Sequence, residues 1–189
     1  LFKREDLTLD EQLSFDLWTY QLQRMQDREQ FFYDGLVFDQ MNGIQSFVPT
    51  FLINFHRVET ADDMRAYIER VMAVSPRMQE AIDNASRGAT KGVVSQSFAL
   101  DGTVMQARSV ISGLPFESDA VNNSDLWADM LQEIQALQDS DTIDEATAGQ
   151  LREQGRDALV NYLQPAYENI IQWAENALSL IHISEPTRL

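Results

Sequence analysis

Residues 60–92, TADDMRAYIERVMAVSPRMQEAIDNASRGATKG, decide the fold class of this chain. The segment Thr60-Ala61-Asp62-Asp63 carries a hydroxyl and carboxylates where a helix start needs capping groups. Apolar side chains then recur at the three- and four-residue spacing of one helix face: Met64, Tyr67, Ile68, Val71 and Met72. This spacing predicts an amphipathic helix with a buried stripe.

The dipeptide Ser75-Pro76 interrupts this pattern. Proline lacks the N–H that an interior helical position needs, and serine is a good cap. The sequence therefore predicts that one helix ends here and that a second begins, runs to about Lys91 and closes at Gly92.

The segments before residue 60 are also helical in pattern. A capping box at Thr8-Leu9-Asp10-Glu11 predicts a helix to about Arg28. Its apolar residues predict a wide buried face: Leu13, Leu17, Trp18, Tyr20, Leu22 and Met25. Residues 34–48 are expected to form a structured loop, and a short helix is expected to start near Pro49.

Three more helices are predicted beyond residue 92. They cover about 96–112, 125–137 and 142–177, and Pro165 should kink or break the last one. No segment shows the alternation typical of strands. The sequence therefore predicts an all-α fold, a multi-helix antiparallel array.

The composition excludes several partners. The chain has 14 basic and 30 acidic residues, a net charge of −16, which disfavours nucleic acid and anionic membranes. It has no cysteine and no run of 18 apolar residues, so we expect neither disulfides nor a membrane span.

The final residues, 178–189 (LSLIHISEPTRL), resemble a translated sequencing adapter. We therefore expect residues 1–177 to be a partial helical domain and residues 178–189 to be a non-native tail. Because the chain starts with Leu1 instead of Met, we also expect it to be a fragment of a longer protein.

The sequence gives little support for a site that binds a metal ion or a cofactor. The chain has two histidines, His56 and His182, and zinc needs three or four clustered ligands. The segment from Asp139 resembles a calcium loop, but its sixth position is not glycine and its twelfth is Gln150. We expect no catalytic residue, metal site or cofactor in this chain.

Three stretches together resemble a known family. They are LTLDEQLSFDLWTYQL, FDQMNGIQSFVPTFLINFHRVETADDMRAYIERV and LQPAYENIIQWAENAL. In this order they are similar to the N-terminal half of the bacterial "domain of unknown function 885" family. The most specific parts are Gln40-x-x-Gly43, the Asn54-Phe55-His56 turn and the helix from Thr60.

The resemblance implies the N-terminal half of a larger, helical, zinc metallopeptidase-like fold. In that family a downstream H-E-x-x-P-G-H motif would bind zinc and activate water, and this chain does not contain it. The implied partners are the missing C-terminal half and a peptide substrate, in a periplasmic or secreted location. Candidate substrate-binding residues in a cleft wall are Gln40, Asn42, Gly43 and His56, although Gly43 is also explained by a loop position that needs a positive φ.

Two functions therefore stay open. The chain is either the non-catalytic N-terminal part of a zinc-dependent peptidase-like hydrolase, or a helical binding or scaffolding module without chemistry. The H-E-x-x-P-G-H motif in the untruncated reading frame would separate them.

Overall fold

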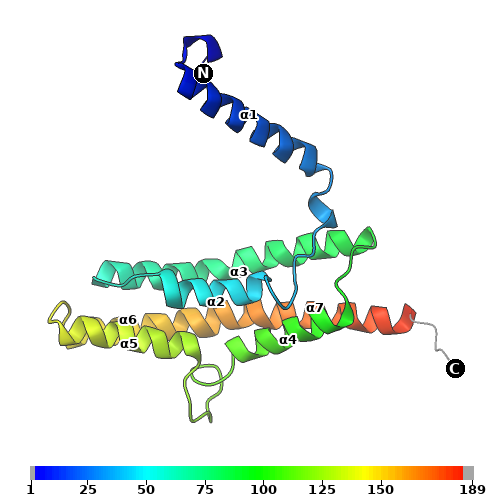
Figure 1. Cartoon of the computed structure of the whole chain (residues 1–189). Helices are drawn as coiled ribbons and strands as arrows, with labels where there is room; N and C mark the ends of the chain where they lie inside the picture. Colours follow the sequence, from blue (N-terminus) through cyan, green and yellow to red (C-terminus); the bar gives the residue numbers. More distant parts are fainter. Residues whose placement is uncertain (1–2, 185–189) are drawn as a thin grey trace. The chain divides into compact units, whose positions relative to one another are not determined.

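The computed structural model describes residues 3–184, with side chains as far as Ser179. The chain divides into two compact units, one ending at Gly35 and the other starting at Leu36. Residues 3–184 contain helices and no strand, which confirms the all-α prediction (Figure 1).

The first unit is built on α1 (Leu9–Glu29), flanked by the 3-10 turns η1 (Arg4–Asp6) and η2 (Phe32–Asp34). The Thr8 N–H donates to the Glu11 carboxylate at 2.8 Å, as the capping box predicts. The predicted buried face is wrong, because α1 has no buried residue and Trp18 is 65% exposed. A single helix with short turns has no second layer against which to bury a face.

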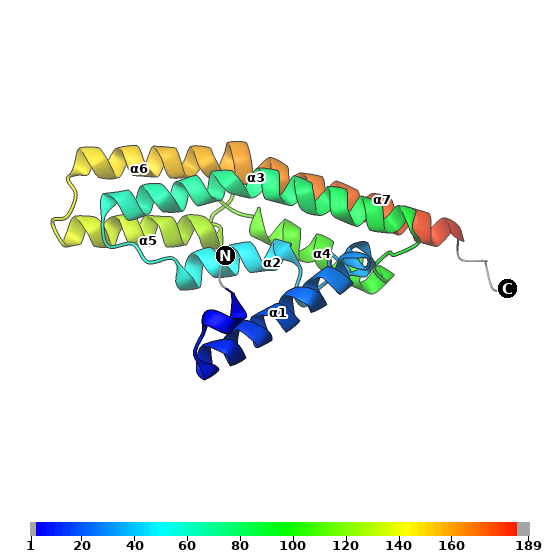
Figure 2. The ribbon, with the colours of Figure 1, turned by 90° about the horizontal axis from the view of Figure 1, so that it is seen from above.

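The second unit contains the remaining helices: α2 (Ile44–Phe55), α3 (Ala61–Thr90), α4 (Ser97–Val110), α5 (Asp125–Asp139), α6 (Glu145–Ala158) and α7 (Gln164–Ser184). A π-helical turn, η3 (Leu159–Leu163), joins α6 to α7. The helices α6 and α7 and the turn between them form one long rod. Figures 1 and 2 show α3 beside this rod and running in the same direction, while α5 runs back along α6 and α4 runs back along α7. The helix α2 packs on α3, α4 and α5.

The core lies between these helices and is almost entirely apolar. Its largest side chains with less than 2% exposure are Tyr67, Tyr167, Phe38, Met64, Met78, Leu100, Leu126, Met130, Ile134, Leu151, Leu159 and Leu163. They come from α3 to α7 and from the segment before α2, so burial of this set holds the second unit together.

The predicted break at Ser75-Pro76 is wrong, because α3 is one helix of 30 residues with Pro76 inside it. The Pro76 ring is exposed, while Val74 and Met78 on either side are buried. An interior proline costs about 3 kcal/mol. Continuous burial of the α3 stripe on both sides of Pro76 offsets this cost.

The start of α2 also differs from the prediction. It begins at Ile44, with Gly43 as the N-cap, so residues 44–48 are helical and Pro49 lies inside the helix. Pro49 cannot donate to the carbonyl of Gln45, four residues earlier. The Tyr167 hydroxyl donates to that carbonyl instead, at 2.7 Å, and comes from α7.

The predicted helix over 142–177 starts later and extends further. Asp144, rather than Thr142, is the N-cap of α6, and it accepts from the Thr147 N–H at 2.8 Å. The turn η3 precedes Pro165 and interrupts the regular helix there, as proline predicts. The helix α7 ends at Ser184, and the last part of the predicted tail, residues 185–189, lies outside the described residues.

Candidate functional site

The helix α2 has an exposed aromatic face opposite its buried one. Leu52 and the Gln45 side chain point into the core, with 3% and 0% exposure. Phe47, Phe51 and Phe55 follow at four-residue spacing on the other face, and their rings stack with centroids 5.9 and 6.0 Å apart. Three large apolar rings in solvent on one stripe are typical of a binding surface.

An open groove of about 440 Å³ lies between α2 and α3, and we call it the α2–α3 groove. It is lined by Val37, Ile44, Phe47, Val48, Phe51, Leu52, Arg70, Ala73, Val74, Arg77, Glu80, Ala81 and Asn84. The lining is mainly apolar, and all of its charged groups come from α3. Ligand sites in proteins combine an apolar surface with a few polar groups in this way.

The charged groups of the groove differ in their partners. The Arg77 guanidinium pairs with the Glu80 carboxylate at 3.1 Å in an exposed ion pair. Arg70 contacts the ring of His56, with Nη1 close to Nδ1 and 3.4 Å from Nε2. Arg70 is thus the groove cation whose described partner carries no negative charge.

His56 contacts two groups through its ring nitrogens. Nε2 lies 3.1 Å from the backbone oxygen of Asp63. The Arg70 guanidinium contacts the same ring, with Nη1 close to Nδ1. These contacts hold Arg70 beside His56 at the end of α2.

A half-buried carboxylate pair lies behind His56. The His56 and Tyr67 rings are 5.0 Å apart, and the Tyr67 hydroxyl donates to Asp129 at 2.7 Å. Burial raises the pKa of Asp129, against the lowering effect of this hydrogen bond. Burial and the neighbouring Asp129 raise the pKa of Glu133 on the same helix. We call His56, Tyr67, Arg70, Asp129 and Glu133 the His56 cluster.

The other candidate residues belong to the loop before α2. The carbonyl of Gln40 accepts from Gln106 Nε2 at 2.8 Å, and its side chain packs over Gly102 of α4. Asn42 is exposed, and its N–H donates to the Asp39 carboxylate at 2.6 Å. The contacts of Gln40 attach the loop to α4, and the Asn42 hydrogen bond lies within the loop.

Gly43 is required for a reason other than the predicted one. Its φ is −65°, so the positive-φ explanation is wrong. A Cβ at Gly43 would lie 2.0 Å from Gln45 Oε1. The Gln45 amide occupies that space and donates to the Asp39 carbonyl at 2.7 Å and to Gln106 Oε1 at 2.9 Å.

The structure separates the four candidates into two places. Gln40, Asn42 and Gly43 precede α2, whereas His56 is its C-cap, about 18 Å away along the axis of a 12-residue helix. Their substrate-binding role stays a prediction. The groove residues Phe47 and Arg70 were missed, because the expected loop over 34–48 removed Phe47 from the helical stripe of Phe51 and Phe55.

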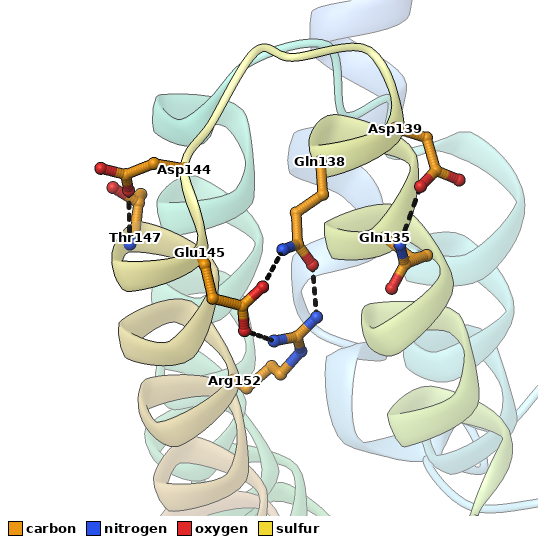
Figure 3. Close-up of polar contacts among 7 residues, drawn as sticks. All are labelled: Gln135, Gln138, Asp139, Asp144, Glu145, Thr147 and Arg152. Carbon is orange, nitrogen blue, oxygen red and sulfur yellow. Dashed lines mark hydrogen bonds and ion pairs between the residues drawn. The ribbon is translucent and has the colours of Figure 1, made fainter.

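The segment that resembles a calcium loop is the turn between α5 and α6. Figure 3 shows Asp139 and Asp144 on opposite sides of this turn, where Asp139 accepts from Gln135 and Asp144 caps α6. Hydrogen bonds from Thr147 lower the pKa of Asp144. The described part of the chain contains no group of three or more metal-ligating side chains.

Glu145, Gln138 and Arg152 hold the same two helices together. Gln138 donates to Glu145 at 2.6 Å, and Arg152 contacts both residues (Figure 3). This network is structural, and it lies on other helices than those that line the α2–α3 groove. No helix within residues 3–184 is long and apolar enough to cross a bilayer.

The comparisons with known proteins identify a family. The model of the family described as "Bacterial protein of unknown function (DUF885)" matches residues 1–181. Neither the curated proteins nor the solved structures gave a match to the chain. Since the matched region covers nearly the whole chain, this protein belongs to the DUF885 family of bacterial proteins.

Proposed function

We propose that this chain is a non-catalytic, substrate-binding part of a zinc-dependent peptidase-like hydrolase. In this proposal the α2–α3 groove is part of the wall of the substrate cleft and takes an apolar side chain of a peptide. The observation that carries the proposal is the open apolar groove with the exposed rings of Phe47 and Phe51 on its rim.

The dimensions and chemistry of the groove support a peptide ligand. Its volume of about 440 Å³ lies within the range of small-ligand sites, which is roughly 300–1,000 Å³. An aromatic rim and an aliphatic floor favour phenylalanine-like or leucine-like side chains, since buried apolar area drives such binding.

The donor set of the described residues does not fit zinc. The described residues bring no three metal-ligating side chains together, and both ring nitrogens of His56 are engaged. The proposal therefore places the metal ligands and the water-activating residue in another part of a longer, periplasmic or secreted protein. Gln40, Asn42, Gly43 and His56 would shape the cleft wall, with His56 acting through Arg70.

A titration of the chain with blocked dipeptides tests this proposal. N-acetyl-Ala-Phe-amide should bind, and N-acetyl-Ala-Ser-amide should bind at least several-fold more weakly. Phe51→Ala should weaken the first peptide by about twofold to twelvefold, since an aromatic contact contributes roughly 0.5–1.5 kcal/mol. The control is Phe98→Ala, which removes an exposed ring of α4 outside the groove. Equal affinity for both peptides would contradict the proposal.

The exposed face of α1 favours a second candidate, a helical binding or scaffolding module. Its apolar residues Leu9, Leu13 and Met25 are 84%, 62% and 64% exposed. The untruncated reading frame separates the two candidates. An H-E-x-x-P-G-H motif downstream supports the hydrolase, and its absence supports the module.

A further inference from the structure

We infer that Arg70 makes the α2–α3 groove selective for a peptide C-terminus, whose α-carboxylate it binds while the last side chain lies in the groove. This inference rests on the proposed peptide-binding function and specifies its substrate class. The described geometry joins an apolar groove to an arginine at its wall that contacts the His56 ring.

Arg70 lies at the wall of the groove. It belongs to α3 and lines the same groove as Phe47 and Phe51 on α2. An aromatic side chain in the groove would therefore bring its attached backbone to a surface that includes a guanidinium. In a C-terminal residue this backbone ends in a carboxylate.

Arg70 keeps several N–H donors available for a ligand. A guanidinium has five N–H donors, and the described bonds of Arg70 use Nη1 alone. Both contacts are to the imidazole ring of His56 and not to a carboxylate. The remaining donors of Arg70 match the two oxygens of a carboxylate.

The other groove cation differs in this respect. Arg77 already pairs with Glu80 at 3.1 Å, and both side chains are largely exposed, at 76% and 62%. A ligand carboxylate at Arg77 would have to compete with Glu80. Arg77 is therefore the matched control, since it has the same charge, lies on the same helix and lines the same groove.

The net charge of −16 opposes anions but does not decide the outcome. At physiological salt, charges on the exposed surface are screened beyond about 8 Å. A direct, charge-assisted hydrogen bond acts at about 2.8 Å and is not screened in this way. Direct contact with Arg70 therefore outweighs the screened surface carboxylates. The carboxylates that oppose it at short range are Glu80 in the groove and Asp129 and Glu133 of the His56 cluster.

The experiment compares two ligands that differ only in the terminal group. N-acetyl-Ala-Phe with a free carboxylate and N-acetyl-Ala-Phe-amide are titrated into the chain by calorimetry at neutral pH and about 0.15 M salt. The acid should bind about tenfold more tightly than the amide, as expected of a hydrogen bond to a charged group. Arg70→Gln should reduce this ratio to about one, Arg70→Lys should restore part of it, and Arg77→Gln should leave it unchanged. The thermal midpoint of each variant establishes that it is folded.

The outcomes separate this inference from the proposed function. If both ligands bind equally and Phe51→Ala weakens both, the groove binds peptides and the role of Arg70 is wrong. If neither ligand binds the unmodified chain, both the groove function and the role of Arg70 are wrong. The inference is also overturned if the preference for the acid survives Arg70→Gln or disappears in Arg77→Gln. Decanoate, a carboxylate without a peptide group, is titrated as well, and tighter binding of decanoate than of the peptide acid would overturn the inference too.

Discussion

Single side chains determine how the loop before α2 is held. The Gln45 amide is completely buried. Its Nε2 donates to the backbone carbonyl of Asp39 in the loop and to the side chain of Gln106 on α4. Its Oε1 has no hydrogen-bond partner within the described residues. Because this buried amide fills the space beside Gly43, no room is left for a methyl group at that position.

Gly43→Ala should therefore destabilise the fold. The new Cβ would displace the Gln45 amide, and the loss of its hydrogen bonds should cost about 1–3 kcal/mol in the free energy of unfolding. Urea unfolding measures this change. Gly149→Ala is the control, because a Cβ there meets nothing within 4 Å and alanine is the better helix former. Equal stability of Gly43→Ala and the unmodified chain would disprove this reading of Gly43.

The half-buried carboxyl group of Asp129 should give the free energy of unfolding an unusual pH dependence. Burial raises its pKa in the folded chain above the unfolded value of about 3.9. The folded state therefore binds its proton more tightly, and the charged form destabilises the fold at neutral pH. This penalty falls as pH drops through the folded pKa, the reverse of the effect of a salt-bridged aspartate.

Asp129→Asn should consequently raise the thermal midpoint at neutral pH by about 2–4 °C. Asparagine still accepts from Tyr67, and loss of the charge also relieves Glu133. The gain should shrink as pH falls through the folded pKa and vanish only below about pH 3, where Asp129 is protonated in both the folded and the unfolded state. Asp101→Asn, at an exposed position on α4, should show no such trend. A gain that does not depend on pH would exclude the charge as its cause.

At the scale of the helices, the capping residues Thr8 and Thr60 predicted helix starts correctly, whereas Pro49 and Pro76 did not mark the boundaries expected of them. The capping residues Thr8 and Thr60 begin α1 and α3 as predicted, because a cap involves only neighbouring residues. Pro49 was predicted to start a helix and Ser75-Pro76 to break one, and both predictions were wrong. The contacts that compensate for them, such as Tyr167 for Pro49, lie far away in the sequence. The groove was missed for the same reason, since its walls come from two helices.

The contact between Pro49 and Tyr167 can be tested by a double-mutant cycle. Tyr167→Phe removes the donor to the Gln45 carbonyl and should cost about 1–2 kcal/mol in the free energy of unfolding. In a Pro49→Ala background the alanine N–H can donate to the same carbonyl, so Tyr167→Phe should cost less. Tyr162→Phe on η3, which is 37% exposed, is the control. Additive effects of the two substitutions would show that Tyr167 does not compensate for the proline.

For the whole molecule, the sequence predicted the class of fold and the family, and both are confirmed. It did so because helical periodicity and capping repeat along the chain, so errors at single boundaries do not change the result. The proposed function depends instead on two or three side chains that the fold brings together. Phe51 and Arg70 lie 19 positions apart, and no periodic pattern connects them.

The chain alone should neither retain zinc nor cleave peptides. His56 is the one histidine before the predicted tail, its Nε2 lies 3.1 Å from the Asp63 backbone oxygen, and Arg70 contacts its Nδ1. Zinc at His56 would have to displace one of these contacts and tolerate a nearby guanidinium. Asp129, the nearest half-buried carboxylate, accepts from Tyr67 and gains from being protonated, whereas zinc needs it charged. The measurement is metal analysis of the chain after dialysis against zinc, beside a peptidase assay with added zinc. One retained equivalent of zinc, or a chelator-sensitive cleavage that His56→Ala abolishes, would place a catalytic site in this chain.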